Sequence, residues 1–221
     1  LLSLTQTIVP AYGRCWEAHG AAETGRLLGR FTGLYARLAF PMIAGTAAVA
    51  PIALPLLASD RYAPAAEVAP WALAGMAIES WVVVASAGLM LAKRTRPLWG
   101  AVAVAAVFNL LLNVVLLPRL GIVGAAVASI VSMGALAVGV AALGARTVRI
   151  AMPWRELALH AGASAAMYAA IAPLSAGSPI ATLALQVVAG VAVYAAIELA
   201  LDPRARELAA AGLARVGAGP R

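Results

Sequence analysis

The chain has 221 residues, of which 63% are hydrophobic and only 11% are charged, and its mean hydropathy is +0.92. A soluble domain of this size could not cover its surface with so few charges, so that class is excluded. The net charge of +7 does not indicate nucleic-acid binding, because the positive residues lie in short segments between apolar runs. The single cysteine, Cys15, excludes an internal disulfide and gives no metal-ligand spacing, so no metal or cofactor is expected.

Apolar runs long enough to cross a bilayer recur along the chain, which predicts an all-α, polytopic bundle of transmembrane helices. The chain begins inside such a run at Leu1, and we expect it to be the C-terminal piece of a longer protein. The pattern predicts the end of one helix and then six complete spans. Their expected ranges are 1–12, 33–58, 68–92, 97–118, 120–145, 155–174 and 179–201.

Residues 13–32 are expected to form a basic, amphipathic connector on the cytoplasmic side. Apolar residues fall on one helical face here and in the turns that follow, and Arg26, Arg30 and Arg37 fall on the other. This pattern is typical of a helix that lies at a membrane surface and leads into a span. Gly25, Gly29 and Gly33 repeat every four residues, which predicts either a dimerisation face or close packing on a neighbouring segment.

Glu79 is the one acidic residue deep inside a predicted span. A carboxylate there costs several kcal/mol unless it is protonated or paired. It is therefore either a cavity group that titrates with a coupling proton or meets a polar headgroup, or a protonated acid that joins helices. Because the loop at 93–96 is short, the spans on either side should be antiparallel neighbours, and Asn109 is the expected partner of Glu79.

Residues 108–132 predict a hairpin of two membrane helices. Asn109 and Asn113 share one helical face, where they either line a cavity or join helices by hydrogen bonds. Pro118 and Arg119 begin a tight break, and small residues then recur at helical spacing. These small residues predict a face that lets another helix come close. The helix-packing candidates are Gly121, Gly124, Ala125 and Ala128.

The last two spans are generic apolar helices, followed by a cytoplasmic tail at 202–221. We expect His160 to be a solvated residue at the membrane interface, with a proton relay as the alternative, and Tyr194 and Gln186 to pack between helices. Glu198 is expected to join an interfacial charge cluster near the tail. The other expected members of that cluster are Asp202, Arg204 and Arg206.

The positive residues predict the orientation of the chain. All of the sixteen Lys and Arg residues except Arg61 and Arg119 lie in alternate segments between the spans. The excess of positive charge on the cytoplasmic side of membrane proteins therefore places 13–32, 93–96, 146–155 and the C-terminus in the cytoplasm.

The hairpin also carries a family resemblance. Its pattern Asn109-x-x-x-Asn113, then Pro118-x-x-Gly121-x-x-Gly124-Ala-Ala, resembles the signature of polysaccharide-lipid flippases in the multidrug/oligosaccharidyl-lipid/polysaccharide exporter superfamily. The order of connector, Pro-rich span, Asp60-Arg61-Tyr62 loop and hairpin is similar to the C-terminal lobe of O-antigen-type and lipid II-type flippases.

The resemblance implies one lobe of a two-lobe exporter that alternates access around a central cavity. Residues 33–145 would be the four-helix core of that lobe, and 155–201 two additional helices. The expected function is movement of a lipid-linked oligosaccharide or polysaccharide precursor across a bacterial inner membrane, with a proton or Na⁺ as a possible coupling ion. Glu79, Asn109 and Asn113 are then cavity candidates.

The basic connector would have a matching role. Arg26, Arg30 and Arg37 would attract a pyrophosphate headgroup, although membrane topology and binding of membrane lipids explain them equally well.

Three alternatives remain open. A cation-coupled drug or metabolite exporter of the same superfamily is the nearest. A membrane-embedded glycosyl- or acyltransferase would need a constellation of His, Asp or Glu at a membrane face, and the two histidines are not grouped with acids across spans. A structural membrane subunit is the third. No nucleotide-binding loop, metal-ligand cluster or catalytic triad is visible, so no catalytic residue and no enzyme activity are expected.

Overall fold

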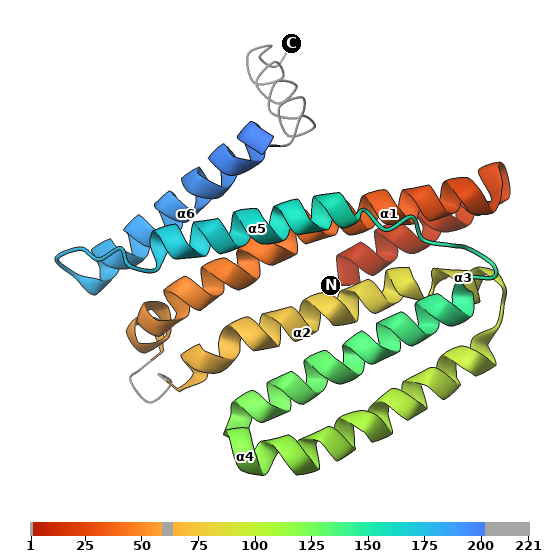
Figure 1. Cartoon of the computed structure of the whole chain (residues 1–221), viewed down its shortest axis with the longest axis horizontal. Coiled ribbons are helices and arrows are strands. Elements are labelled where there is room, and N and C mark those ends of the chain that lie inside the picture. The colour runs from red at the N-terminus through yellow and green to blue at the C-terminus, as the bar shows by residue number, and fades with distance from the viewer. Residues whose placement is uncertain (1, 59–63, 202–221) are drawn as a thin grey trace.

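The computed structural model of the protein describes residues 2–58 and 64–201, with side chains from residue 8 onward. These residues form six helices and no strand, so the all-α, polytopic architecture is confirmed. Figure 1 shows the helices running roughly along one direction, with α5 beside α1, α2 on the other side of α1, and α4 beyond α2. The helices are α1 (Leu2–Leu57), α2 (Ala65–Ala85), α3 (Ala87–Leu91), α4 (Thr95–Gly144), α5 (Trp154–Ile171) and α6 (Pro179–Leu201).

Four helical segments in the described part of the chain are long and apolar enough to cross a membrane. They are Ile8–Leu57, Ala65–Leu91, Thr95–Gly144 and Pro179–Leu201. The protein is therefore a membrane protein by length and composition. Helix α5 has 18 residues, covers most of the expected span 155–174, and is not one of the four.

Two of these segments are 50 residues long, which corresponds to about 75 Å of helix against a hydrocarbon core of about 30 Å. Each is divided by a glycine with a positive φ. Gly20 has φ 75° and Gly121 has φ 59°, and Figure 1 shows the chain turning back at both places. A left-handed backbone conformation costs a residue with a Cβ atom about 1–2 kcal/mol of conformational free energy, so glycine is favoured at both turns.

The turn at Gly121 lies where the sequence predicts the hairpin, and it divides α4 into a first arm (95–120) and a second arm (122–144). The beginning of the chain differs from the expectation. The first helix does not end at residue 12 but continues to Gly20, and the helix from 21 to 57 has no break between connector and span. Residues 13–19 stay helical because none of them demands another conformation, whereas Gly20 adopts one that only glycine reaches easily.

The glycine face of α1 is occupied within the chain. A Cβ atom on Gly25 would collide with the carbonyl oxygen of Arg149, and one on Gly29 with that of Ala151. The Ala151 N–H donates a hydrogen bond of 3.1 Å to the Gly25 carbonyl oxygen. The glycines therefore let the segment between α4 and α5 lie directly on α1, which supports close packing on a neighbour over the dimerisation alternative.

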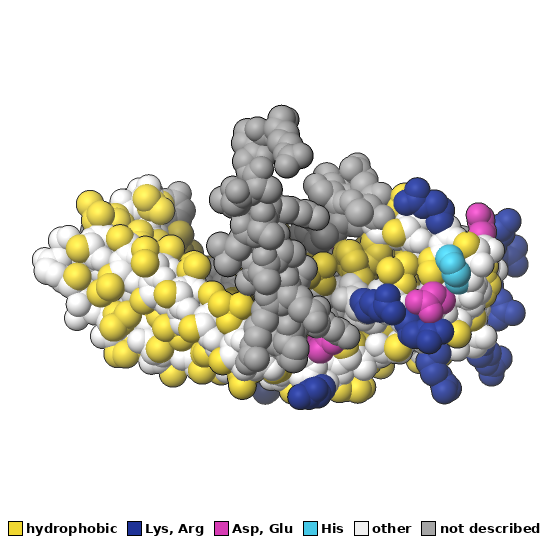
Figure 2. All heavy atoms as spheres, turned by 90° about the horizontal axis from the view of Figure 1, so that it is seen from above, with side chains coloured by type: hydrophobic (Ala, Val, Ile, Leu, Met, Phe, Trp, Pro, Cys, Tyr) yellow, Lys and Arg dark blue, Asp and Glu magenta, His cyan; other side chains and the backbone are white. Residues whose placement is uncertain are grey.

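The charged side chains gather toward one end of the molecule, as Figure 2 shows for the face in view. That end holds the turn of α1 at Gly20, helix α3 with the loop that follows it, and the segment between α4 and α5 (Figure 1). The three segments predicted to be cytoplasmic, 13–32, 93–96 and 146–155, thus come together at one end. This grouping agrees with the orientation predicted from the arginines.

Candidate functional site

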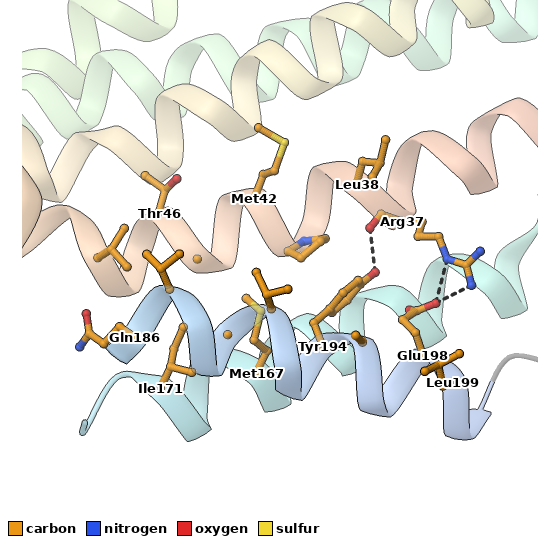
Figure 3. A pocket seen from close by; sticks show the side chains of 17 residues that line it. Arg37, Leu38, Met42, Thr46, Met167, Ile171, Gln186, Tyr194, Glu198 and Leu199 are labelled. Carbon is orange, nitrogen blue, oxygen red and sulfur yellow. Dashed lines mark hydrogen bonds and ion pairs between the residues drawn. The ribbon is translucent and has the colours of Figure 1, made fainter. Parts of the chain in front are cut away.

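A groove with a volume of about 720 Å³ lies between α1 and α6, and α5 forms its floor (Figure 3). We call it the α1–α6 groove. Its walls are almost entirely apolar. The apolar residues include Leu38, Met42, Val49, Met167, Ile171, Val187 and Val191.

Small residues make the room for this groove. Gly45 of α1 has only the Met167 methyl within 4 Å of where a Cβ would stand, at 3.8 Å. Gly190 of α6 lies over Ile171, whose Cδ1 would be 3.3 Å from an added Cβ. Larger side chains at these two positions would occupy the space that now separates α1 from α6, so the groove depends on glycine in both walls.

One end of the groove is polar. Glu198 of α6 is only 4% exposed, and its Oε2 accepts hydrogen bonds from Nε and Nη2 of Arg37 on α1, at 2.9 and 2.8 Å. Its Oε1 lies 2.7 Å from Nδ1 of His160 on α5. The Tyr194 hydroxyl donates to the backbone carbonyl oxygen of Arg37 at 2.8 Å (Figure 3). We call Arg37, His160, Tyr194 and Glu198 the polar cluster, and it joins three helices that lie far apart in sequence.

The polar cluster corrects three expectations. His160 is 3% exposed and Glu198 4% exposed, so neither is a solvated interfacial residue. Arg37 points to Glu198 rather than toward lipid headgroups. Sequence reasoning missed the cluster because each residue alone looks interfacial. The other predicted members of the charge cluster, Asp202, Arg204 and Arg206, lie outside the described residues.

The other two candidate headgroup arginines remain at the surface. The Arg26 and Arg30 side chains are 59% and 67% exposed, and both approach the carboxylate of Glu23, at 3.0 and 3.7 Å. Exposed ion pairs of this kind contribute about 0–1 kcal/mol, so these guanidinium groups can exchange their partner readily. They are in a position to meet an anionic headgroup, whereas Arg37 is not.

Glu79 lines a second cavity, of about 430 Å³, between α2 and the second arm of α4. Its side chain is exposed, and Ser129 and Met133 lie across the cavity. The expected pairing with Asn109 is not found among the described residues, because Asn109 belongs to the first arm. Glu79 therefore faces a cavity whose lining has few polar groups, and its two predicted roles stay predictions.

The two asparagines of the hairpin both form side-chain hydrogen bonds, one between the arms of α4 and one within the first arm. Asn109 Nδ2 donates to the Ser132 hydroxyl at 2.9 Å across the two arms of α4. Asn113 Nδ2 donates to the Asn109 carbonyl oxygen and to its Oδ1, at 2.9 and 3.1 Å. The Asn109 bond supports the second of the two predicted roles, that of joining helices, whereas the Asn113 bonds stay within the first arm.

Three of the four small residues of the hairpin are buried or partly buried, and the fourth, Gly121, is exposed at the turn. Gly124 is buried, and an added Cβ would stand 2.7 Å from the Leu116 carbonyl carbon on the first arm. Ala128 is fully buried, and Ala125 is partly buried beside the Glu79 cavity. Gly121 differs from the packing prediction, since nothing lies within 4 Å of an added Cβ, and its role is the positive φ of the turn.

The chain was compared with protein families, curated proteins and solved structures. No protein-family model, no curated protein and no solved structure matches the chain.

Proposed function

We propose that the chain is the C-terminal lobe of a flippase that moves a lipid-linked oligosaccharide or polysaccharide precursor across a bacterial inner membrane. The observation that carries the proposal is the α1–α6 groove, which is apolar along its walls and polar at one end. A lipid-linked glycan has the same division into an apolar chain and a polar head. The resemblance of the hairpin to polysaccharide-lipid flippases supports the same class.

In this proposal the isoprenoid chain lies against Met42, Val187 and Val191, and the head lies toward the charged end of the molecule. Burying each CH₂ group of such a chain contributes about 0.8 kcal/mol, so a groove of this size supplies binding energy without polar contacts. The exposed guanidinium groups of Arg26 and Arg30 attract the pyrophosphate. Rocking of this lobe against a second one then exposes the head to either side in turn.

Filling the groove tests the proposal. Gly45→Leu places a side chain in the groove without moving the backbone, since its Cβ makes only an ordinary contact with Met167. Gly139→Leu is the matched control, because a Cβ there meets nothing within 4 Å and Gly139 is not part of the groove. Export is measured by complementation of a flippase-deficient strain with the full-length protein, beside its abundance in the membrane.

We expect Gly45→Leu to lower export at least about tenfold at normal abundance, which corresponds to a loss of about 1.4 kcal/mol of chain binding. Gly139→Leu should export like the parent. Equal export by the two variants would remove the groove from the mechanism and with it the main support for the proposal.

A second candidate function, a cation-coupled drug or metabolite exporter of the same superfamily, has one observation in its favour. Glu79 is an exposed carboxyl within a membrane helix, at the edge of a cavity that the α1–α6 groove does not include. Such carboxyls are the usual places where transporters bind a coupling proton or cation. Export of a cationic dye by the full-length protein, without complementation of the flippase-deficient strain, would favour this candidate.

A further inference from the structure

The polar cluster contains a protonatable pair for which the proposed function has no use. We propose that His160 and Glu198 form a proton-binding site that controls how tightly α6 is held against α1 and α5. The inference concerns the joint between these helices and does not depend on what the protein transports.

The two side chains form a buried hydrogen-bonded pair, which becomes an ion pair when the imidazole is protonated. The side chains of His160 and Glu198 are 4% and 5% exposed, and their Nδ1 and Oε1 atoms are 2.7 Å apart. The carboxylate offers its other oxygen to Arg37, so each cation uses a different oxygen of the same acceptor. The charged or titratable groups of the cluster are Arg37 from α1, His160 from α5, and Tyr194 and Glu198 from α6. Glu156 of α5 lies one helical turn before His160, and its carboxylate lies against Gly33 of α1, one turn before Arg37.

The charges of the cluster differ between two protonation states. With a neutral imidazole, His160 holds Oε1 of Glu198 through an ordinary N–H donor. With a protonated imidazole, the same contact becomes an ion pair in surroundings of low dielectric constant. Charge-assisted hydrogen bonds are about twice as strong as neutral ones, so binding a proton strengthens the link between α5 and α6.

The position of the cluster makes this link important for α6. Helix α6 packs mainly on α1 and α5, and the cluster supplies hydrogen bonds from α6 to both of them. Arg37, Tyr194 and Glu198 also form one end of the α1–α6 groove (Figure 3). When the ion pair weakens, α6 moves more freely at that end, and the groove widens.

Histidine is the side chain that changes charge between about pH 5 and pH 8. The inference therefore predicts that α6 is held closely at the acidic end of this range and more loosely at the basic end. We test this in the full-length protein, with Cys15→Ser as background, by placing spin labels at Met42→Cys on α1 and Val191→Cys on α6. Both positions line the groove, and their side chains are 61% and 69% exposed.

Electron paramagnetic resonance then gives the distance distribution between the two labels. We expect it to shift toward longer distances as the pH rises from about 5 to about 8. His160→Gln keeps a hydrogen-bond donor but cannot titrate, so its distribution should not change over this range. His19→Gln is the matched control, because His19 is the only other histidine of the chain and lies outside the cluster.

A second variant, Glu198→Gln, keeps the shape of the carboxylate and removes its charge. It should show the longer distances at both ends of the pH range. The inference is overturned if the parent shows no pH-dependent shift, or if His160→Gln shifts as much as the parent. If neither cluster variant folds, the pH dependence of the label distances in the parent and in His19→Gln still tests the inference. A parent without a shift contradicts it. A shift that is lost in His19→Gln also contradicts it, because the titrating group would then be His19.

Discussion

At the scale of single residues, two glutamates of membrane helices have opposite surroundings. Glu198 accepts hydrogen bonds from Arg37 and sits against His160, whereas Glu79 has an exposed side chain at the edge of a cavity. Because Glu79 makes no packing contact that a similar side chain would lose, we expect Glu79→Gln to change the free energy of unfolding by less than about 0.5 kcal/mol. If it titrates during transport, the same variant should fail in glycan export, measured by complementation beside membrane abundance.

Glu67→Gln provides the control for this prediction, since Glu67 is the other acid of α2 and lies in its first turn. It should export like the parent. Full export by Glu79→Gln together with lower abundance of Glu79→Ala would instead give the carboxyl a packing role. Full export and normal abundance in both variants would remove Glu79 from the mechanism.

The sequence identifies Glu79 but not the polar cluster, and the reason is physical. An acid in the middle of an apolar run is conspicuous, because the length of the run alone shows that the carboxyl lies deep in the membrane, where a charge is unfavourable. Arg37, His160 and Glu198 each lie near the end of a predicted span, where charged groups are ordinary. Their burial results from the packing of α1, α5 and α6, and no pattern within one helix records which faces meet.

At the scale of the elements, the α4 hairpin depends on close contact between its arms. A side chain at Gly124 would collide with the backbone of Leu116, which cannot move without bending the first arm. We expect Gly124→Leu to destabilise the full-length protein by about 1–3 kcal/mol or more, measured as a lower unfolding midpoint in detergent. Gly134→Leu, on the same arm with nothing within 4 Å of an added Cβ, should unfold like the parent. A Gly124→Leu protein with the parent's unfolding midpoint would show that the arms do not need this contact.

The elements also show where sequence reasoning works. The hairpin was predictable because a proline and two glycines interrupt an apolar run that is too long for one crossing. The end of the first helix was not, because residues 13–19 are compatible with helix and with loop alike. The structure resolves this at Gly20, whose positive φ turns the chain several residues later than the polar composition suggested.

At the scale of the whole molecule, the basic segments define one end, and this predicts the orientation in the membrane (Figure 2). In a Cys15→Ser background, Ala63→Cys should react with an impermeant thiol reagent in intact cells, and Thr95→Cys should react only after the membrane is opened. Ala63 lies outside the described residues, and its predicted exposure rests on the sequence alone. Labelling of Thr95→Cys but not Ala63→Cys in intact cells would reverse the orientation.

The architecture was predictable because apolar run lengths and arginine positions are read directly along the chain. The α1–α6 groove was not, since its walls come from helices more than 120 residues apart and its room comes from single glycines on each.

The segment that packs on the glycine face of α1, around Arg149 and Ala151, has a consequence for biosynthesis. Gly25 leaves the ribosome long before Ala151, and at about 5–20 residues per second the delay is on the order of 6–25 seconds. During that interval the rest of α1, then α2 and the α4 hairpin are added, while the segment that packs on the Gly25–Gly33 face has not yet been made. The contact that seats the segment before α5 is thus among the last to form, and a chain stalled before residue 148 presents this face to whatever factor attends its insertion.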